Sequence, residues 1–162
     1  GCQDLIKTRI SNGLDKLENG EVDTVVIAGM GGMLITEILS QDIDITKSMK
    51  ELVLQPQSDI TIVRNLLSDI NFSIIEEDMV IEDGKYYVMM RAVPSNIVNE
   101  SSYELSRKEY VHYGRILLES KHPVLKSFLH KEKNNLKVEA LEKREEIIQK
   151  LDIIDRALRY YE

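Results

Sequence analysis

A cluster of glycines carries the first pattern in this sequence that could do chemistry. Gly29, Gly31 and Gly32 follow a run of mostly β-branched residues, 24–28, and precede an apolar segment. This pattern predicts a strand, a tight turn and a helix. Glycines in such a turn let a ligand approach the backbone beside the unpaired N–H groups of a helix start. A dinucleotide fingerprint is excluded because its third glycine would fall at Leu34. Close packing of helix on strand is the alternative role for these glycines.

A second strand end carries a polar side chain. Residues 51–57 read ELVLQPQ, and the apolar strand stops at Pro56, which cannot donate to a ladder. In a parallel sheet, Gln55 and Pro56 would line one crevice together with the glycine turn, at the edge where open α/β sheets bind ligands. This arrangement favours group transfer by positioning of a ligand. The alternative role for Gln55 and Pro56 is simple strand termination.

Other reactive side chains are sparse. His112, His122 and His130 lack the spacing of paired metal ligands, so we predict no metal site. One cysteine, Cys2, excludes an internal disulfide and a thiolate zinc site. The carboxylates of residues 76–78 lie beside a predicted edge strand, and we expect them to face solvent.

The elements around these motifs predict an α/β fold, the C-terminal half of a Rossmann-like doubly wound sheet. A brief helix is expected at 14–17 and a loop with a short helix at 41–50. Ser58 or Asp59 would cap the helix 60–68, with one apolar face formed by Ile62, Val63, Leu66 and Leu67. Two β-rich runs around Asp83-Gly84 then predict an antiparallel hairpin at the sheet edge.

The pattern becomes helical after a polar linker, residues 94–102. We therefore predict two domains, 1–93 and 94–162. A helix starting at Pro123 could run from Val124 to Tyr160 with a narrow apolar stripe, which needs a partner. That partner could be the same chain folded back near residues 133–135, or another chain in a coiled coil.

Charge is divided between the two parts. The 162-residue chain has a net charge of −7. Residues 1–93 hold 8 basic and 16 acidic side chains, whereas residues 94–162 hold 13 and 12. The helical part could therefore face phosphate, although a solvated helix surface is the alternative. We see no membrane span and no secretory signal, so we expect a cytoplasmic location.

These motifs in order carry a family resemblance. VDTVVIAGMGG, ELVLQPQ and EEDMVIEDGKYYVMMRA, followed by YGRILLESKHPVLKSFL, resemble the bacterial S-adenosylmethionine-dependent tRNA methyltransferases that modify N1 of adenine 22. The resemblance implies a Rossmann-like methyltransferase domain and a helical, coiled-coil-like extension. It also implies S-adenosylmethionine as cofactor and tRNA as partner.

The resemblance assigns roles to individual residues. It implies that the substrate base is held against the methyl donor by Gly29, Met30, Gly31, Gln55 and Pro56. N1 of the substrate adenine is already nucleophilic, so the attack needs no strong general base. It places Asn12, Gly13 and Leu14 near the adenine end of the cofactor, and it implies that Ala28 and Gly29 also contact the cofactor. Substrate contacts would come from Gly32, Lys121, Lys126, Lys131, Lys133 and Lys137.

One departure from the family lowers the expected activity. The family holds the methionine and ribose of the donor on two strands that precede the region resembling Gly1. We therefore expect a fragment that binds S-adenosylmethionine poorly and is inactive alone. The alternatives are a non-catalytic assembly module with a coiled-coil tail and a methyltransferase acting on a small molecule. An exposed strand edge also predicts a homo-oligomer.

Overall fold

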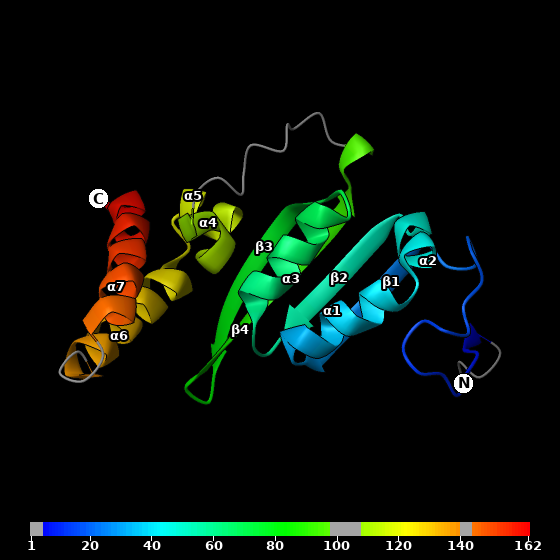
Figure 1. The fold of residues 1–162 in the computed structure, drawn as a ribbon, viewed down its shortest axis with the longest axis horizontal. Helices are drawn as coiled ribbons and strands as arrows, with labels where there is room; N and C mark the ends of the chain where they lie inside the picture. The colour runs from blue at the N-terminus through cyan, green and yellow to red at the C-terminus, as the bar shows by residue number, and fades with distance from the viewer. Residues whose placement is uncertain (1–4, 98–107, 140–143) are drawn as a thin grey trace.

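The computed structural model describes residues 5–97, 108–139 and 144–162 (Figure 1). The sheet part contains β1 (Thr24–Met30), α1 (Gly32–Gln41), α2 (Ile43–Ser48), β2 (Glu51–Pro56), α3 (Ile60–Asp69), β3 (Phe72–Glu82), β4 (Lys85–Pro94) and the short 3₁₀ turn η2 (Ser95–Ile97). The helical part contains α4 (Lys108–Tyr113), α5 (Arg115–Glu119), α6 (Pro123–Glu139), α7 (Arg144–Leu158) and the 3₁₀ turn η4 (Arg159–Tyr161).

Four strands form one sheet in the order β1-β2-β4-β3. β1 and β2 are parallel, and β4 runs antiparallel to both β2 and β3. The predicted hairpin is confirmed, and its turn residues Asp83 and Gly84 have positive φ angles of 49° and 75°, as a two-residue hairpin loop requires. β4 is antiparallel to β2. The hairpin turn, which precedes β4, therefore lies at the end of the sheet where β1 and β2 finish.

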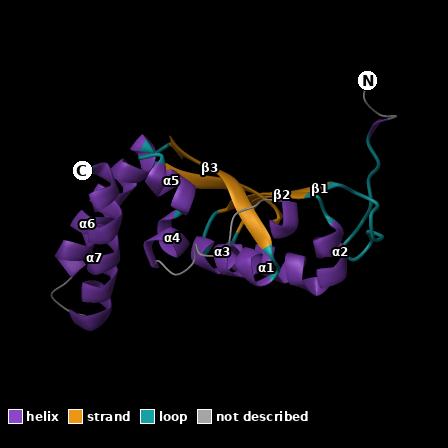
Figure 2. Cartoon of the chain, turned by 90° about the horizontal axis from the view of Figure 1, so that it is seen from above, coloured by secondary structure: helices purple, strands orange, loops and turns teal. Residues whose placement is uncertain are grey.

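Helices α1, α2 and α3 cover one face of the sheet (Figure 2). Side chains of β1 alternate accordingly: Val25 and Ile27 are buried under the helices, whereas Val26 is 66% exposed on the other face. Among the described strands, β1 pairs only with β2, so its outer edge has no strand beside it. This agrees with the predicted half of a doubly wound sheet.

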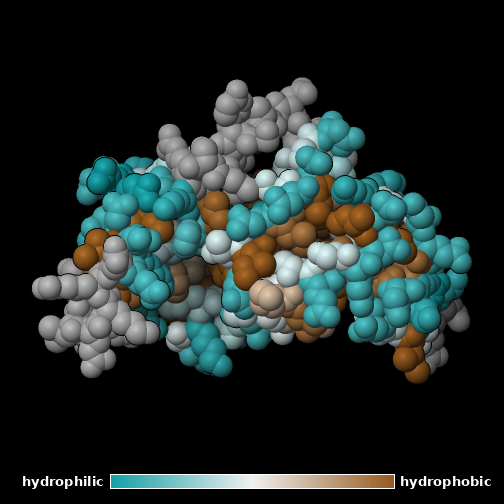
Figure 3. All heavy atoms as spheres, in the orientation of Figure 1, coloured by the Kyte–Doolittle hydropathy of each residue, from teal (hydrophilic) through white to brown (hydrophobic). Residues whose placement is uncertain are grey.

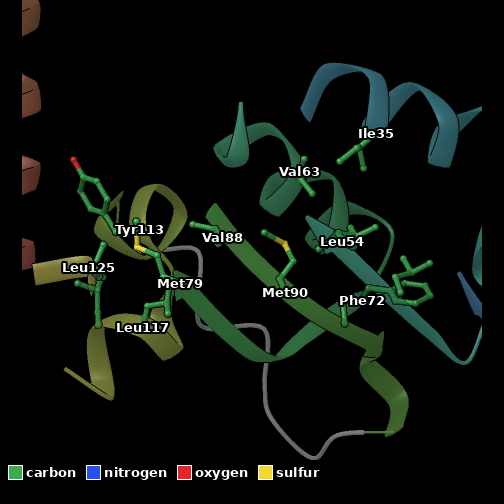
Figure 4. Packing of buried hydrophobic residues seen from close by; sticks show 14 of the residues in the cluster. Ile35, Leu54, Val63, Phe72, Met79, Val88, Met90, Tyr113, Leu117 and Leu125 are labelled. Atoms are coloured by element: carbon green, nitrogen blue, oxygen red, sulfur yellow. The ribbon is translucent and has the colours of Figure 1, made fainter. Parts of the chain in front are cut away.

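A continuous apolar core connects the sheet with the helical part (Figure 4). Leu54, Val63 and Met90 pack between the sheet and α3, and the core continues to Leu117 and Leu125 beyond the hairpin. The helical part therefore lies against the hairpin end of the molecule, opposite the N-terminal segment (Figure 1). The division into domains at residue 93 stays a prediction.

The C-terminal helices form a hairpin within this chain. Ion pairs join Glu132 to Lys150 and Lys133 to Asp155 across α6 and α7. The predicted turn at 133–135 is wrong, since these residues lie inside α6, which continues to Glu139. A coiled coil with another chain stays a prediction.

Three local predictions are corrected by the structure. Residues 14–17 form a turn rather than a helix, with the Leu17 N–H donating to the Leu14 carbonyl. Asp59 makes no side-chain cap, because its own φ is 52° and its carboxylate accepts a hydrogen bond from the Ser58 hydroxyl. Ile62 is 40% exposed, so only part of the expected apolar face of α3 is buried.

Most of the predicted linker, from residue 98 to 102, lies outside the described residues.

Candidate functional site

Two backbone hydrogen bonds join the turns that follow β1 and β2. The Gln57 N–H donates to the Met30 carbonyl at 2.8 Å, and the Gly32 N–H donates to the Ser58 carbonyl at 2.9 Å. The strands are in register up to Ala28 and Gln55, and Met30 then pairs with Pro56. The structure thus brings the two predicted strand ends together. We call the surface that these two strand ends form, from Gly29 to Gly31 and at Gln55, the crevice.

The glycines of the turn serve two different purposes. Gly29 has a φ of 78° and lies where the register between β1 and β2 shifts. A Cβ at Gly29 would meet only the Gln57 side-chain amide, 3.9 Å away, so this position is open to a ligand. A Cβ at Gly32 would lie 2.5 Å from the Ser58 carbonyl oxygen. Gly32 therefore allows close packing, as in the alternative role, and Gly29 leaves room beside the backbone.

Gln55 presents an unpaired hydrogen-bond donor at the crevice. Its Oε1 accepts the Gly29 N–H at 2.8 Å, which fixes the orientation of the amide. Its Nε2 is buried and has no partner among the described residues. Buried polar atoms are nearly always paired in folded proteins. The free donor is therefore suited to an acceptor on a ligand, such as a ring nitrogen.

Apolar side chains border the same turn. Met30, Met33 and Leu34 are 39%, 58% and 46% exposed. Figure 3 shows apolar side chains in the middle of the face that carries α1 and α3, with hydrophilic side chains around them. An apolar border with one directed amide is typical of sites for small heterocycles.

A buried ion pair links the sheet to the helical part, which the sequence did not reveal. The side chains of Arg64 on α3 and Glu77 on β3 are 2% and 1% exposed, and their nearest charged atoms are 2.8 Å apart. Arg64 also donates to the carbonyls of Val111 and His112, at 3.1 and 3.0 Å. Glu77 accepts the Ile116 N–H at 3.2 Å. We call these residues the polar joint.

The expectation that residues 76–78 all face solvent is therefore wrong for Glu77. Strand alternation places Glu77 on the face that meets α3 and α5, whereas Glu76 points away. Glu76 binds Arg91 at 2.6 Å, and this hydrogen bond lowers the pKa of the Glu76 carboxyl. The partner of Glu77 is Arg64, which lies 13 residues earlier on a helix, so no local sequence pattern indicated this ion pair.

The predicted cofactor contacts lie at two places in this structure. Ala28 and Gly29 lie at the crevice, but a Cβ on Gly13 would lie 2.8 Å from Oε1 of Gln41, the last residue of α1. A Cβ on Gly13 would also lie 3.1 Å from the Ile38 side chain, and Ile38 is six residues, about 9 Å along the helix, from the first residue of α1 at the crevice. Asn12 and Leu14 flank Gly13, and a role in cofactor binding stays a prediction for all five residues.

The predicted substrate lysines differ in their surroundings. Lys133 is paired with Asp155 inside the helical hairpin, so its charge is engaged there. The ammonium of Lys131 lies 5.3 Å from the ring centroid of Tyr86, and that of Lys126 lies 5.8 Å from the ring centroid of Tyr161. Lys121 is exposed between α5 and α6. The side chain of Lys137 lies outside the described part of the chain.

A profile of the TrmK family, tRNA (adenine(22)-N(1))-methyltransferase, matches residues 1–162. The chain belongs to this family. The tRNA (adenine(22)-N(1))-methyltransferase of Bacillus subtilis is 36% identical over 92 residues, which are 57% of this chain and 39% of that protein. The chain thus spans about two-fifths of the length of the curated relatives that it matches.

Solved structures confirm the Rossmann-like fold. The Streptococcus pneumoniae protein Sp1610, solved in complex with S-adenosyl-L-methionine, has a TM-score of 0.83 and 30% identity, covering 98% of this chain and 71% of that chain. A Streptococcus agalactiae protein of the NADB-Rossmann superfamily has a TM-score of 0.77 and 28% identity, covering 99% and 68%. No helix among the described residues is long and apolar enough to cross a membrane.

Proposed function

We propose that this chain acts in the methylation of N1 of adenine 22 in tRNA, and that the crevice receives the adenine. The observation that carries the proposal is the unpaired Nε2 of Gln55, held beside the open turn at Gly29. Membership of the tRNA (adenine(22)-N(1))-methyltransferase family supplies the substrate and the reaction class. The family match gives no support to a non-catalytic assembly module.

The crevice residues would act by positioning. S-adenosylmethionine supplies an electrophilic methyl group when it is bound. Gln55 donates from Nε2 to a ring nitrogen other than N1, which leaves the N1 lone pair free to attack. N1 of adenine carries no proton at neutral pH, so the attack needs no general base, and the exocyclic amine loses a proton afterwards. The apolar border at Met30 and Met33 excludes water from the base.

The helical part would contact the body of the tRNA. Residues 107–150 hold 11 basic and 7 acidic side chains, and Lys121, Lys126 and Lys131 are exposed there. Such cations bind phosphates without reading sequence, so they would set the orientation of the tRNA while the crevice selects the base.

Methyl transfer by the protein tests the proposal. A tRNA transcript is incubated with S-adenosylmethionine and digested, and 1-methyladenosine at position 22 is measured by mass spectrometry. Gln55→Leu should lower the initial rate by about 10- to 100-fold, the loss of one buried hydrogen bond. Gln149→Leu, an exposed position on α7, is the matched control. An unchanged rate for Gln55→Leu, or methylation at another adenine, would overturn the assignment.

A further inference from the structure

A cavity lies between the sheet and the helical part. Its volume is about 340 Å³, within the range of small-ligand sites. Its lining includes Gln57 and Ser58 from the turn after β2, Tyr86 from β4, Tyr113 from α4 and Phe128 from α6. We call it the aromatic cavity.

The aromatic cavity and the crevice share a wall. Gln57 and Ser58 line the cavity, and the same two residues are bonded through their backbones to Met30 and Gly32 of the glycine turn. A ligand in the crevice and a ligand in the cavity would therefore lie on the two sides of this short segment. Two successive groups of one polymeric substrate can reach both sides.

Ring surfaces form one side of the cavity. The centroids of Tyr86 and Phe128 are 5.1 Å apart in an edge-to-face arrangement, and those of Tyr113 and Phe128 are 6.5 Å apart. Tyr86 and Phe128 are only half-buried, so part of each ring remains open. Proteins that bind unpaired nucleotides use such rings as stacking platforms for bases.

Polar groups beside the rings match a nucleotide better than an apolar ligand. Glu132 accepts hydrogen bonds from the Tyr113 hydroxyl at 3.0 Å and from Lys150 at 2.7 Å. Burial raises the pKa of Tyr113, which keeps its hydroxyl protonated as the donor. Lys131 stands over the Tyr86 ring. The carboxylate can accept from a base amino group, and the ammonium groups can face a phosphodiester.

We propose that the aromatic cavity binds an unstacked nucleobase of the RNA substrate, one that flanks the adenine held in the crevice. This proposal rests on the proposed function. It adds a second base contact, on the far side of Gln57 and Ser58, that fixes which adenine enters the crevice. Base flipping costs stacking energy, and stacking on Tyr86 and Phe128 restores part of it.

Abasic substitutions in the RNA test the proposal with the unaltered protein. The dissociation constant is measured for a tRNA transcript and for transcripts that lack the base on either side of adenine 22. Removal of one flanking base should weaken binding roughly tenfold, the usual value of one stacked base. Equal affinity for both abasic transcripts and the intact transcript would overturn the proposal.

A protein variant then locates the contact. Tyr86→Leu should weaken binding of the intact transcript roughly tenfold, with no further loss when the flanking base is also removed. Tyr87→Leu, on the opposite face of β4 and outside the cavity lining, is the matched control. If the two losses multiply, the base does not stack on Tyr86 and the proposal fails. If the transcript is not bound at all, the proposed function itself fails.

Discussion

Gly114 packs directly against the Glu77 carboxylate of the polar joint. Its φ is 89°, and a Cβ there would lie 2.4 Å from a carboxylate oxygen of Glu77. Glu77 cannot move away freely, because Arg64 and the Ile116 N–H hold its two oxygens. A single missing methyl group thus lets the chain between α4 and α5 approach the sheet.

Gly114→Ala should lower the free energy of unfolding by about 3 kcal/mol, because the methyl group would displace the Glu77 carboxylate. Gly84→Ala is the matched control: Gly84 also has a positive φ, 75°, but a Cβ there meets nothing within 4 Å. The control should cost only about 1 kcal/mol of backbone strain. Urea denaturation measures both values. Equal losses for the two variants would contradict the close contact at Glu77.

The sequence predicted the position of some residues and missed others for a physical reason. Gln55 and Gly29 could be placed at the same end of the sheet because strand ends and glycine turns are local patterns. The burial of Glu77 depends on Arg64, which lies on another element, so no local pattern announces it. The substrate role of Gly32 stays a prediction, and the close approach of the Ser58 carbonyl is enough to require a glycine at this position.

At the scale of elements, the polar joint caps the C-terminal end of α4 and the N-terminal end of α5. Arg64 satisfies carbonyls at the end of α4, and Glu77 satisfies an N–H at the start of α5. Both side chains come from the sheet part of the molecule. The joint therefore fixes where the short helices α4 and α5 sit on the sheet, and with them the walls of the aromatic cavity.

Glu77→Gln should destabilise the protein by about 3 kcal/mol, because it leaves the buried Arg64 without its charge partner. Glu76→Gln, which breaks the exposed pair with Arg91 next to it, should cost less than about 1 kcal/mol. The double variant Arg64→Met, Glu77→Leu should cost less than the two single losses combined. Thermal unfolding is measured for Glu77→Gln, Glu76→Gln, the double variant and its two single variants, Arg64→Met and Glu77→Leu. Simple additivity would contradict a coupled pair.

The Tyr161 hydroxyl should make the free energy of unfolding depend on pH in the alkaline range. Burial raises the pKa of Tyr161 to about 12, and its hydroxyl donates to the His122 carbonyl at 3.1 Å. The unfolded chain loses this proton near pH 10. Stability is therefore full below about pH 10 and falls as the pH rises toward 12. Tyr161→Phe should show a smaller fall over this window in denaturation curves, and an unchanged fall would contradict the burial of the hydroxyl.

Elements with strong local signals were predicted well. The hairpin was found from its Asp83-Gly84 turn and the two β-rich runs around it. The prediction of a helix at 14–17 is wrong because a single turn after Gly13 already pairs the Leu14 carbonyl with the Leu17 N–H, and the chain does not continue as a helix. The reversal between α6 and α7 was misplaced because asparagines at 134 and 135 are tolerated inside a packed helix.

At the scale of the whole molecule, the acidic sheet part and the more basic helical part divide the proposed tasks. The crevice and the aromatic cavity lie at the edge of the sheet where the helical part begins, so a bound RNA would touch both. The charge segregation could be predicted from the sequence. The cavity could not, because its walls come from segments as distant as residues 57 and 150.

Charge reversal tests the contact between helices and tRNA. Lys126→Glu with Lys131→Glu should weaken tRNA binding and make the slope of affinity against salt shallower by up to about 0.9 per lost phosphate contact. Lys47→Glu on α2, in the acidic part, is the matched control. An unchanged salt slope for the double variant would show that these lysines belong to a solvated surface.

The most direct test that the crevice receives adenine 22 is the affinity for tRNA transcripts that differ only in one ring atom of this base. We predict that the protein binds the transcript with adenine about tenfold more tightly than one of two transcripts that carry 3-deazaadenine or 7-deazaadenine, because one analogue lacks the ring nitrogen that accepts from Gln55. Gln55→Leu should remove this preference. Equal affinity of the unaltered protein for all three transcripts, or a preference that survives in Gln55→Leu, would contradict this assignment.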